Sequence, residues 1–185
     1  MSDSNIGARK RRNIRDHLWI IHGIINDIKN GKGSSTDFQI YDLAQCFDSM
    51  WYKETMNDLY DANLNDDKFY LLSQLNKKSK VSIKTPVGNT DIEEYNEIIQ
   101  QGGVWGPLQC SVQMDGIGKD CLETGENLYK YKESVNVPPL AFVDDMIAMA
   151  KCGFKSTMMN EMITKKTKMK KLQFGVKKCK NLHIV

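Results

Sequence analysis

The chain has 185 residues and a formal net charge of +3, with 41% hydrophobic and 26% charged residues. These proportions are typical of a globular domain with its own core and exclude an intrinsically disordered chain. No apolar run is long enough to span a membrane, and the polar, basic start "MSDSNIGARKRRN" carries no secretory signal. The five cysteines have no CxxC spacing, which favours reduced thiols over a zinc site or a disulfide framework. We therefore expect an intracellular protein, in the nucleus or the cytoplasm, without a membrane partner.

Basic residues gather near the two ends of the chain, in "ARKRRNIR" at the start and in "KKTKMKK" and "KKCK" near the end. The middle of the chain is acidic. Basic flanks around an acidic centre suit a polyanion that must approach a metal site. For any single one of these runs, a solvated helix face is the simpler interpretation.

The first half of the chain predicts helices around one strand. Apolar residues recur every three or four positions from about residue 13 to 29, which predicts an amphipathic helix that "NGKGSS" ends. "TDFQIYDL" is rich in β-formers and predicts a strand with Asp42 near its C-terminal end. Asp48 or Ser49 is expected to cap a helix that runs to about Leu59, and another helix is expected through Leu75.

The second half mixes strands and helices. "KVSIKTPVGNTDIEEYNEII" predicts a hairpin that turns at Gly88 and Asn89, and "QQGGVWGPLQCS" begins a helix after its glycines. The apolar run "PPLAFVDDMIAMA" predicts two short strands folded back at its two acidic residues. A helix is expected from about 155 to 172, followed by extended segments in "FGVKKCKNLHIV". No repeat or linker divides the chain, so we expect one α+β domain.

Three carboxylates stand out because each follows or interrupts an apolar run of β-formers: Asp42, Asp144 and Asp145. A rigid sheet can hold such carboxylates against a hard divalent cation, and magnesium prefers oxygen ligands of this kind. Two ions about 3.5–4 Å apart form the clamp of polymerases and nucleases. The positive charge would also keep the adjacent carboxylates ionised. The alternative is turn chemistry alone, because Asp favours hairpin turns.

Four segments occur in a fixed order along the chain: "FQIYDLAQCFDSMW", "QGGVWGPLQCS", "AFVDDM" and "LQFGVKKCKNLHI". They resemble blocks A, B, C and D of reverse transcriptases, most closely those of non-LTR retrotransposons. The upstream "GARKRRNIRDHLWIIHGIIND" resembles the fingers segment that precedes block A, so the resemblance covers nearly the whole chain. It implies a polymerase palm, with an antiparallel sheet packed on helices, over residues 36–185 and part of the fingers over residues 1–35. It also implies that the thumb and the upstream basic residues that grip the triphosphate lie outside this chain.

The resemblance implies an RNA-directed DNA polymerase that joins a dNTP to a primer 3′-hydroxyl. Its partners would be an RNA template, a DNA or RNA primer and dNTPs, and its cofactors two Mg²⁺ ions, with Mn²⁺ as the alternative metal. Asp42 would be the block A metal ligand, Asp144 the principal block C ligand and Asp145 its supporting neighbour.

The same comparison assigns residues to the nucleotide. Phe47 falls where reverse transcriptases place an aromatic steric gate against the ribose 2′-hydroxyl, although a core aromatic beside a strand end is the alternative. Gln101, Gly102 and Gly103 match block B, whose glycines let the backbone approach nucleotide and template; an ordinary loop before a helix is the alternative.

Lys178 corresponds to the block D lysine that protonates the leaving pyrophosphate. Lys177 and Lys180 are close enough in sequence to leave that choice open, and a solvated lysine is the simpler alternative. The competing functional hypothesis is a catalytically incompetent retrotransposon remnant that keeps the palm fold and at most weak nucleic-acid binding.

Overall fold

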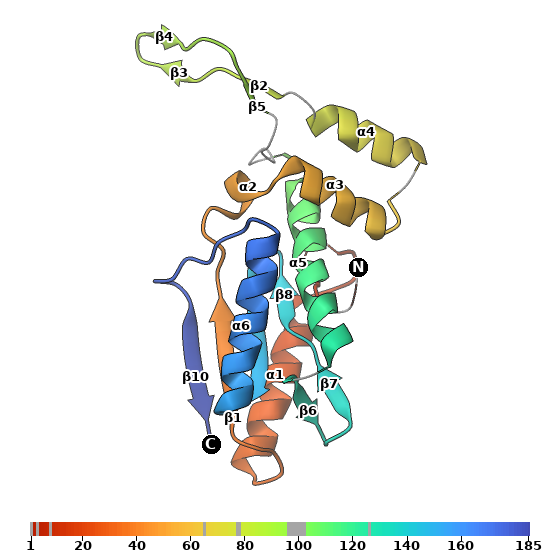
Figure 1. The fold of residues 1–185 in the computed structure, drawn as a ribbon, viewed down its shortest axis with the longest axis vertical. Coiled ribbons are helices and arrows are strands. Elements are labelled where there is room, and N and C mark those ends of the chain that lie inside the picture. Colours follow the sequence, from red (N-terminus) through yellow and green to blue (C-terminus); the bar gives the residue numbers. More distant parts are fainter. Residues whose placement is uncertain are drawn as a thin grey trace.

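The computed structural model describes residues 2, 4–7, 9–64, 66–76, 79–95, 103–125 and 127–185. A sheet with helices on both faces forms the body of the protein, and a helix and a long hairpin project from one end of it (Figure 1). Over these residues, no helix combines the length and apolar character needed to cross a membrane.

The main sheet has four strands. They are β1 (Thr36–Tyr41), β8 (Leu140–Phe142), β9 (Asp145–Lys151) and β10 (Lys180–Ile184). All neighbours are antiparallel, in the order β10-β1-β9-β8. Tyr41 lies opposite Met146, and Phe142 lies opposite Asp145. The predicted strand before Asp42 and the predicted hairpin at the two acidic residues are therefore both present.

One face of the sheet packs on two helices, α5 (Gly106–Thr124) and α6 (Phe154–Met169). Small side chains of β9, Ala148 and Ala150, are completely buried beneath them. Larger side chains from the helices fill the remaining space of this core: Cys110, Met114, Ile117, Cys121, Met159 and Ile163. The repeat of three or four positions along α5 is what places one continuous face of that helix on the sheet.

The opposite face packs on α1 (Ile14–Lys29), together with a small hairpin of β6 (Tyr129–Tyr131) and β7 (Val135–Val137). Phe38 of β1 is buried against Ile24 and Ile28 of this helix. Most of β1 is buried, including the polar residues Asp37 and Gln39, and these two find partners in His183 and Ser156. The helix begins after Asn13, which forms a capping box with Asp16, close to the predicted start.

The helical connection after β1 differs from the prediction. It comprises α2 (Cys46–Ser49) and α3 (Tyr52–Asp61), and α4 (Asp66–Asn76) follows. Asp48 lies inside α2, and neither Asp48 nor Ser49 caps α3, whose first turn follows Trp51 without a side-chain cap. The extended and fully buried Met50 separates the two helices.

The projecting hairpin consists of β2 (Ser79–Val81), β3 (Lys84–Thr85), β4 (Gly88–Asn89) and β5 (Glu93–Tyr95). The predicted turn position was wrong. Thr85 pairs with Gly88, so the turn residues are Pro86 and Val87, whereas Gly88 and Asn89 belong to β4. The fixed φ of proline suits the first central position of a turn, which explains the shift.

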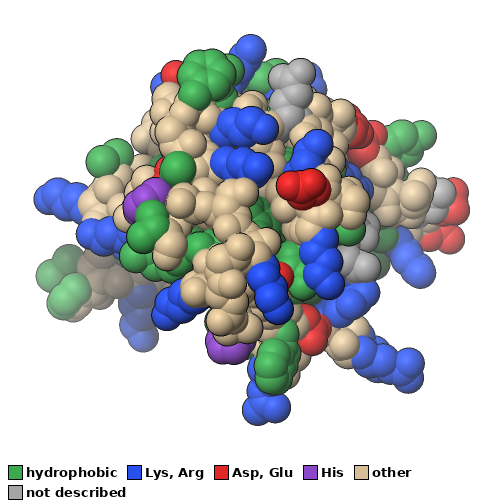
Figure 2. Space-filling view, turned by 90° about the horizontal axis from the view of Figure 1, so that it is seen from below, with side chains coloured by type: hydrophobic (Ala, Val, Ile, Leu, Met, Phe, Trp, Pro, Cys, Tyr) green, Lys and Arg blue, Asp and Glu red, His purple; other side chains and the backbone are tan. Residues whose placement is uncertain are grey.

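The basic runs are spread over the surface. Figure 2 shows the lower end of the view in Figure 1, where Lys and Arg side chains outnumber acidic ones and are scattered over the face. Not every lysine of these runs is simply solvated, because Lys166 pairs with Asp120 and the largely buried Lys170 pairs with Asp58.

Candidate active site at the ends of neighbouring strands

The three acidic residues singled out in the sequence meet at one end of the sheet. Because Tyr41 lies opposite Met146, Asp42 and Asp145 occupy the next positions along β1 and β9. Asp144 precedes β9 and is one of the two turn residues between β8 and β9. The charges of Asp42 and Asp144 both act on Asp145, as expected for carboxylates that share one site.

The turn that carries Asp144 has an unusual backbone. Its other central residue, Val143, has a φ of +59°. A β-branched residue rarely adopts this conformation and keeps it only where the surrounding structure holds it. The flanking strands are well buried, since Ala141 and Met146 expose 3% and 2% of their surfaces. Asp144 and Asp145 thus lie at the tip of a hairpin whose strands are anchored in the core.

A lysine faces the carboxylates. Lys178 Nζ lies 2.9 Å from Asp42 Oδ1. The hydrogen bond and charge of Asp42 raise the pKa of Lys178, and the charges of Asp144 and Asp145 raise this pKa further. Of the three lysines considered for block D, the structure therefore brings Lys178 to Asp42, although its chemical role stays a prediction.

The backbone after α6 explains how Lys178 reaches the site. Phe174 forms an isolated antiparallel bridge with Leu43, and Gly175 N donates to Asp42 O at 2.9 Å. A turn follows, in which Lys178 N donates to Gly175 O at 2.7 Å. This return loop, residues 173–179, lays the lysine beside Asp42 across a sequence separation that no local pattern reveals.

The ionised form of Asp145 is electrostatically unfavourable in the absence of a cation. Burial raises the pKa of Asp145 above its usual value, and the charges of Asp144 and Asp42 raise this pKa further, while Lys178 lowers it. The site therefore disfavours ionisation of Asp145, and an added cation would relieve the repulsion that acts on it.

The donor chemistry fits a hard divalent cation. Asp42 Oδ1 is buried, and the ammonium of Lys178 is the group that faces it; no further hydrogen-bond partner for this oxygen is present in the described part of the chain. As the side chains are placed, no three acidic, histidine or cysteine residues within the described ranges already surround a metal position. Carboxylates around a metal would thus have to turn inward, and Lys178 would have to release Asp42.

The predicted steric gate lies directly after this strand. Phe47 belongs to α2, is half-buried and packs against the core cluster beneath the helix. This packing agrees with the alternative of a core aromatic, and the steric gate stays a prediction.

Of the block B residues, Gln101 and Gly102 lie outside the described residues. Gly103 is exposed, and its carbonyl accepts a hydrogen bond from Gly106 N at 3.1 Å at the start of α5. It lies in the segment leading into the helix, as expected for either interpretation.

Sequence reasoning missed a pair of thiols beneath the turn. Cys46 Sγ of α2 lies 3.0 Å from Cys110 Sγ of α5. The contact with Cys46, burial and the nearby charge of Asp144 all raise the pKa of Cys110. All five cysteines are free in the structure. A usable signal existed, because the two residues belong to blocks A and B, which flank the same site.

Comparison with known families decides the classification. The sequence model of the family "Reverse transcriptase (RNA-dependent DNA polymerase)" matches residues 1–184. The chain belongs to this reverse transcriptase family. No curated protein sequence matches it significantly.

Solved telomerase structures share the fold of this reverse transcriptase chain. Telomerase from Candida tropicalis, in complex with a TWJ fragment of telomeric RNA, superposes with a TM-score of 0.71 at 12% identity. The match covers 97% of this chain and 30% of the telomerase. The corresponding Candida albicans complex has a TM-score of 0.70 at 13% identity, covering 92% and 30%. At such identities the likeness establishes the fold, and this chain spans under a third of either telomerase. The predicted α+β palm-and-fingers class is confirmed.

Proposed function

We propose that this chain is the catalytic part of an RNA-directed DNA polymerase of the non-LTR retrotransposon type. The observation that carries the proposal is the meeting of Asp42, Asp144 and Asp145 at neighbouring strand ends of a reverse transcriptase fold. The four ordered blocks support the retrotransposon subtype. Under this proposal residues 1–35 belong to the fingers and residues 36–185 to the palm.

Asp42 and Asp144 would hold two Mg²⁺ ions, or Mn²⁺ in their place, with Asp145 as the supporting carboxylate. When bound, these ions supply the positive charge that activates the primer 3′-hydroxyl and stabilises the leaving pyrophosphate. The strands of the sheet hold the carboxylates in register, because phosphoryl transfer depends chiefly on positioning and electrostatics.

The remaining residues act on the nucleotide. Lys178 keeps its proton because neighbouring carboxylates raise its pKa, so its Nζ is available to protonate the pyrophosphate. The ring of Phe47 excludes a ribose 2′-hydroxyl and thereby selects dNTPs. Gln101, Gly102 and Gly103 let the backbone approach nucleotide and template.

The macromolecular partners are an RNA template and a DNA or RNA primer. The telomerases with the same fold were solved with telomeric RNA, which supports an RNA partner for this chain. The proposed chemistry, synthesis of DNA on an RNA template, supports a nuclear or cytoplasmic location.

Primer extension on an RNA template with dNTPs and Mg²⁺ tests the proposal. Asp144→Asn removes one charge from the proposed metal site, so we expect at least ~100-fold slower extension. Asp91→Asn is the matched control, because Asp91 is an exposed acidic residue of the projecting hairpin. Equal extension by wild type and Asp144→Asn contradicts the proposed role.

Phe47→Ala tests the gate in the same assay. The variant should incorporate rNTPs that wild type refuses, because the ring no longer meets the 2′-hydroxyl. Unchanged selectivity would leave Phe47 as a core aromatic.

The alternative is an incompetent remnant with the palm fold. The ion pair between Lys178 and Asp42 favours it, since the lysine neutralises the carboxylate that a metal would need. Absence of extension by wild type, together with weak RNA binding unaffected by Asp144→Asn, would support this alternative.

A further inference from the structure

The N-terminal segment of the chain, residues 4–7, lies alongside the strand that leads into the acidic turn. Asn5 forms a parallel bridge with Ala141 of β8. Ala141 N donates to Ser4 O at 2.7 Å, and Ile6 N donates to Ala141 O at 3.2 Å. The segment therefore extends the sheet beyond β8, two residues before Val143.

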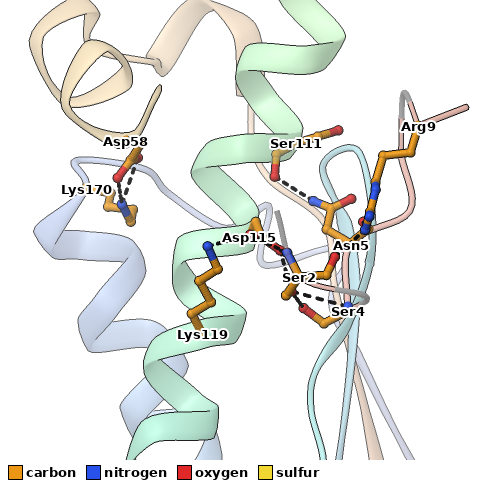
Figure 3. A network of polar contacts seen from close by, with 9 residues as sticks. All are labelled: Ser2, Ser4, Asn5, Arg9, Asp58, Ser111, Asp115, Lys119 and Lys170. Atoms are coloured by element: carbon orange, nitrogen blue, oxygen red, sulfur yellow. Dashed lines mark hydrogen bonds and ion pairs between the residues drawn. The ribbon is translucent and has the colours of Figure 1, made fainter. Parts of the chain in front are cut away.

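Asn5 ties this segment to α5. The side chain is completely buried, and its Nδ2 donates to Ser111 O at 2.8 Å. Its Oδ1 accepts from Gly7 N at 3.0 Å and so shapes the backbone at the glycine. Figure 3 shows Asn5 between α5 and the N-terminal residues, with Ser2 and Asp115 extending the same polar network.

Gly7 meets the backbone of the acidic turn. A Cβ built at Gly7 would lie 2.3 Å from Val143 N, 2.9 Å from Val143 Cα and 2.9 Å from Ser111 Oγ. No change of rotamer can relieve a contact with backbone atoms, so only glycine fits without moving the turn. Val143 is also the residue with a φ of +59°, a conformation that needs support from its surroundings.

We propose that Asn5 and Gly7 are positioning residues that hold the Val143–Asp144 turn and thereby set the direction of the two adjacent carboxylates. The proposal rests on the proposed function for the metal role of those carboxylates. Gly7 acts through the backbone of Val143. Asn5 acts one step further away, through its bridge to Ala141 and its hydrogen bond to Gly7 N. A segment far away in sequence thus fixes the geometry on which the chemistry depends.

Gly7→Ala is the direct test, with Gly23→Ala in α1 as the matched control, because a Cβ at Gly23 meets no atom within 4 Å. Two properties are measured: hydrogen exchange of peptides covering residues 140–147, and the dissociation constant for Mn²⁺ by electron paramagnetic resonance. We expect Gly7→Ala to accelerate exchange in these peptides and to weaken Mn²⁺ binding at least tenfold. Gly23→Ala should match wild type in both.

A second variant separates positioning from folding. Val143→Gly in the Gly7→Ala background removes the side chain that restricts the turn, so the backbone can retreat from the new methyl group. Mn²⁺ affinity should recover at least partly in this double variant. If Gly7→Ala loses its circular dichroism spectrum, the double variant decides. A folded double variant with at least partly recovered Mn²⁺ affinity supports the proposal, whereas a folded double variant without any recovery of affinity, or one that does not refold, overturns it.

The outcomes distinguish this inference from the proposed function. If wild type does not bind Mn²⁺, or if Asp144→Asn does not weaken the binding, the proposed function fails. The hydrogen-exchange data alone then judge the positioning role. If wild type binds Mn²⁺ and Gly7→Ala binds it equally well, the positioning role is overturned while the proposed function stands. Unchanged exchange at residues 140–147 also overturns the positioning role.

Discussion

Two hairpins of this protein are built in opposite ways. The hairpin of β8 and β9 is anchored by β1, by α5 and by the N-terminal segment, and its strand residues Leu140 and Met146 expose 3% and 2% of their surfaces. The projecting hairpin leaves Ile83 at 62% and Val87 at 98% exposure. The first holds an unfavourable turn with adjacent carboxylates, and the second contains only ordinary turn chemistry. The contacts that surround the acidic turn therefore come from residues far away in sequence, whereas those of the projecting hairpin are local.

The largest difference should appear when apolar side chains are removed. Met149→Ala in β9 should lower the free energy of unfolding by about 2–5 kcal/mol, because it leaves a cavity in the core. Ile83→Ala in the projecting hairpin should cost less than about 0.5 kcal/mol, since the side chain is already in water. Urea denaturation followed by circular dichroism measures both, and equal losses would contradict the contrast.

The next contrast concerns hydrogen bonds. Asn5→Ala should cost about 1–3 kcal/mol, because it leaves Ser111 O and Gly7 N buried without their partner. Thr90→Ala removes the exposed acceptor of Ile83 N in the projecting hairpin and should cost less than about 0.5 kcal/mol. The same denaturation experiment applies; a Thr90→Ala loss as large as that of Asn5→Ala would refute the difference.

The buried thiol of Cys121 makes the stability of the core depend on pH. The pKa of Cys121 in α5 is raised from 9.0 to about 12, chiefly by burial and to a smaller extent by the charge of Asp120. Because the thiol holds its proton more tightly in the folded chain than in the unfolded chain, it stabilises the fold fully below pH 9. This contribution to the free energy of unfolding is lost as the pH rises from 9 toward 12. The stability advantage of wild type over Cys121→Ala should therefore shrink by about 1 kcal/mol between pH 8 and pH 10. An advantage that stays constant between these pH values would contradict the raised pKa of Cys121.

The smallest expected effect is a change in Mn²⁺ affinity when the lysine beside Asp42 is replaced. Lys178→Gln removes the ammonium that competes for Asp42 and should tighten Mn²⁺ binding about two- to threefold at low salt. The gain should shrink at high salt, because the ion pair is exposed to screening. Lys177→Gln is the matched control. A weaker affinity in Lys178→Gln would mean that the lysine supports the metal site instead of competing for it.

The local patterns of the sequence predicted the elements that carry the site. The β-formers of "TDFQIYDL" predicted β1 with Asp42 at its end, and the apolar flanks of Asp144 and Asp145 predicted the hairpin. Burial against α1 and α5 then fixed the register that brings Asp42 beside Asp145.

The failures concern contacts and local competition that a pattern does not contain. The return of residues 173–179 to Asp42 and the approach of Gly7 to Val143 are long-range contacts, which only the folded chain defines. Asp48 has the chemistry of a helix cap, yet it lies inside α2 and the next helix starts after Trp51. Pro86 outweighed Gly88 and Asn89 in placing the turn because its φ is already fixed.

The central claim is that Asp42, Asp144 and Asp145 form one divalent-cation site. Cleavage by bound Fe²⁺ tests it without requiring polymerase activity, since hydroxyl radicals formed with ascorbate and peroxide cut the backbone beside the ion. We expect cuts near residue 42 and near residues 144–145 in the same protein, both suppressed by excess Mg²⁺ and both lost in Asp144→Asn. Cleavage at only one of the two segments, or cuts that Mg²⁺ does not suppress, would contradict a shared site.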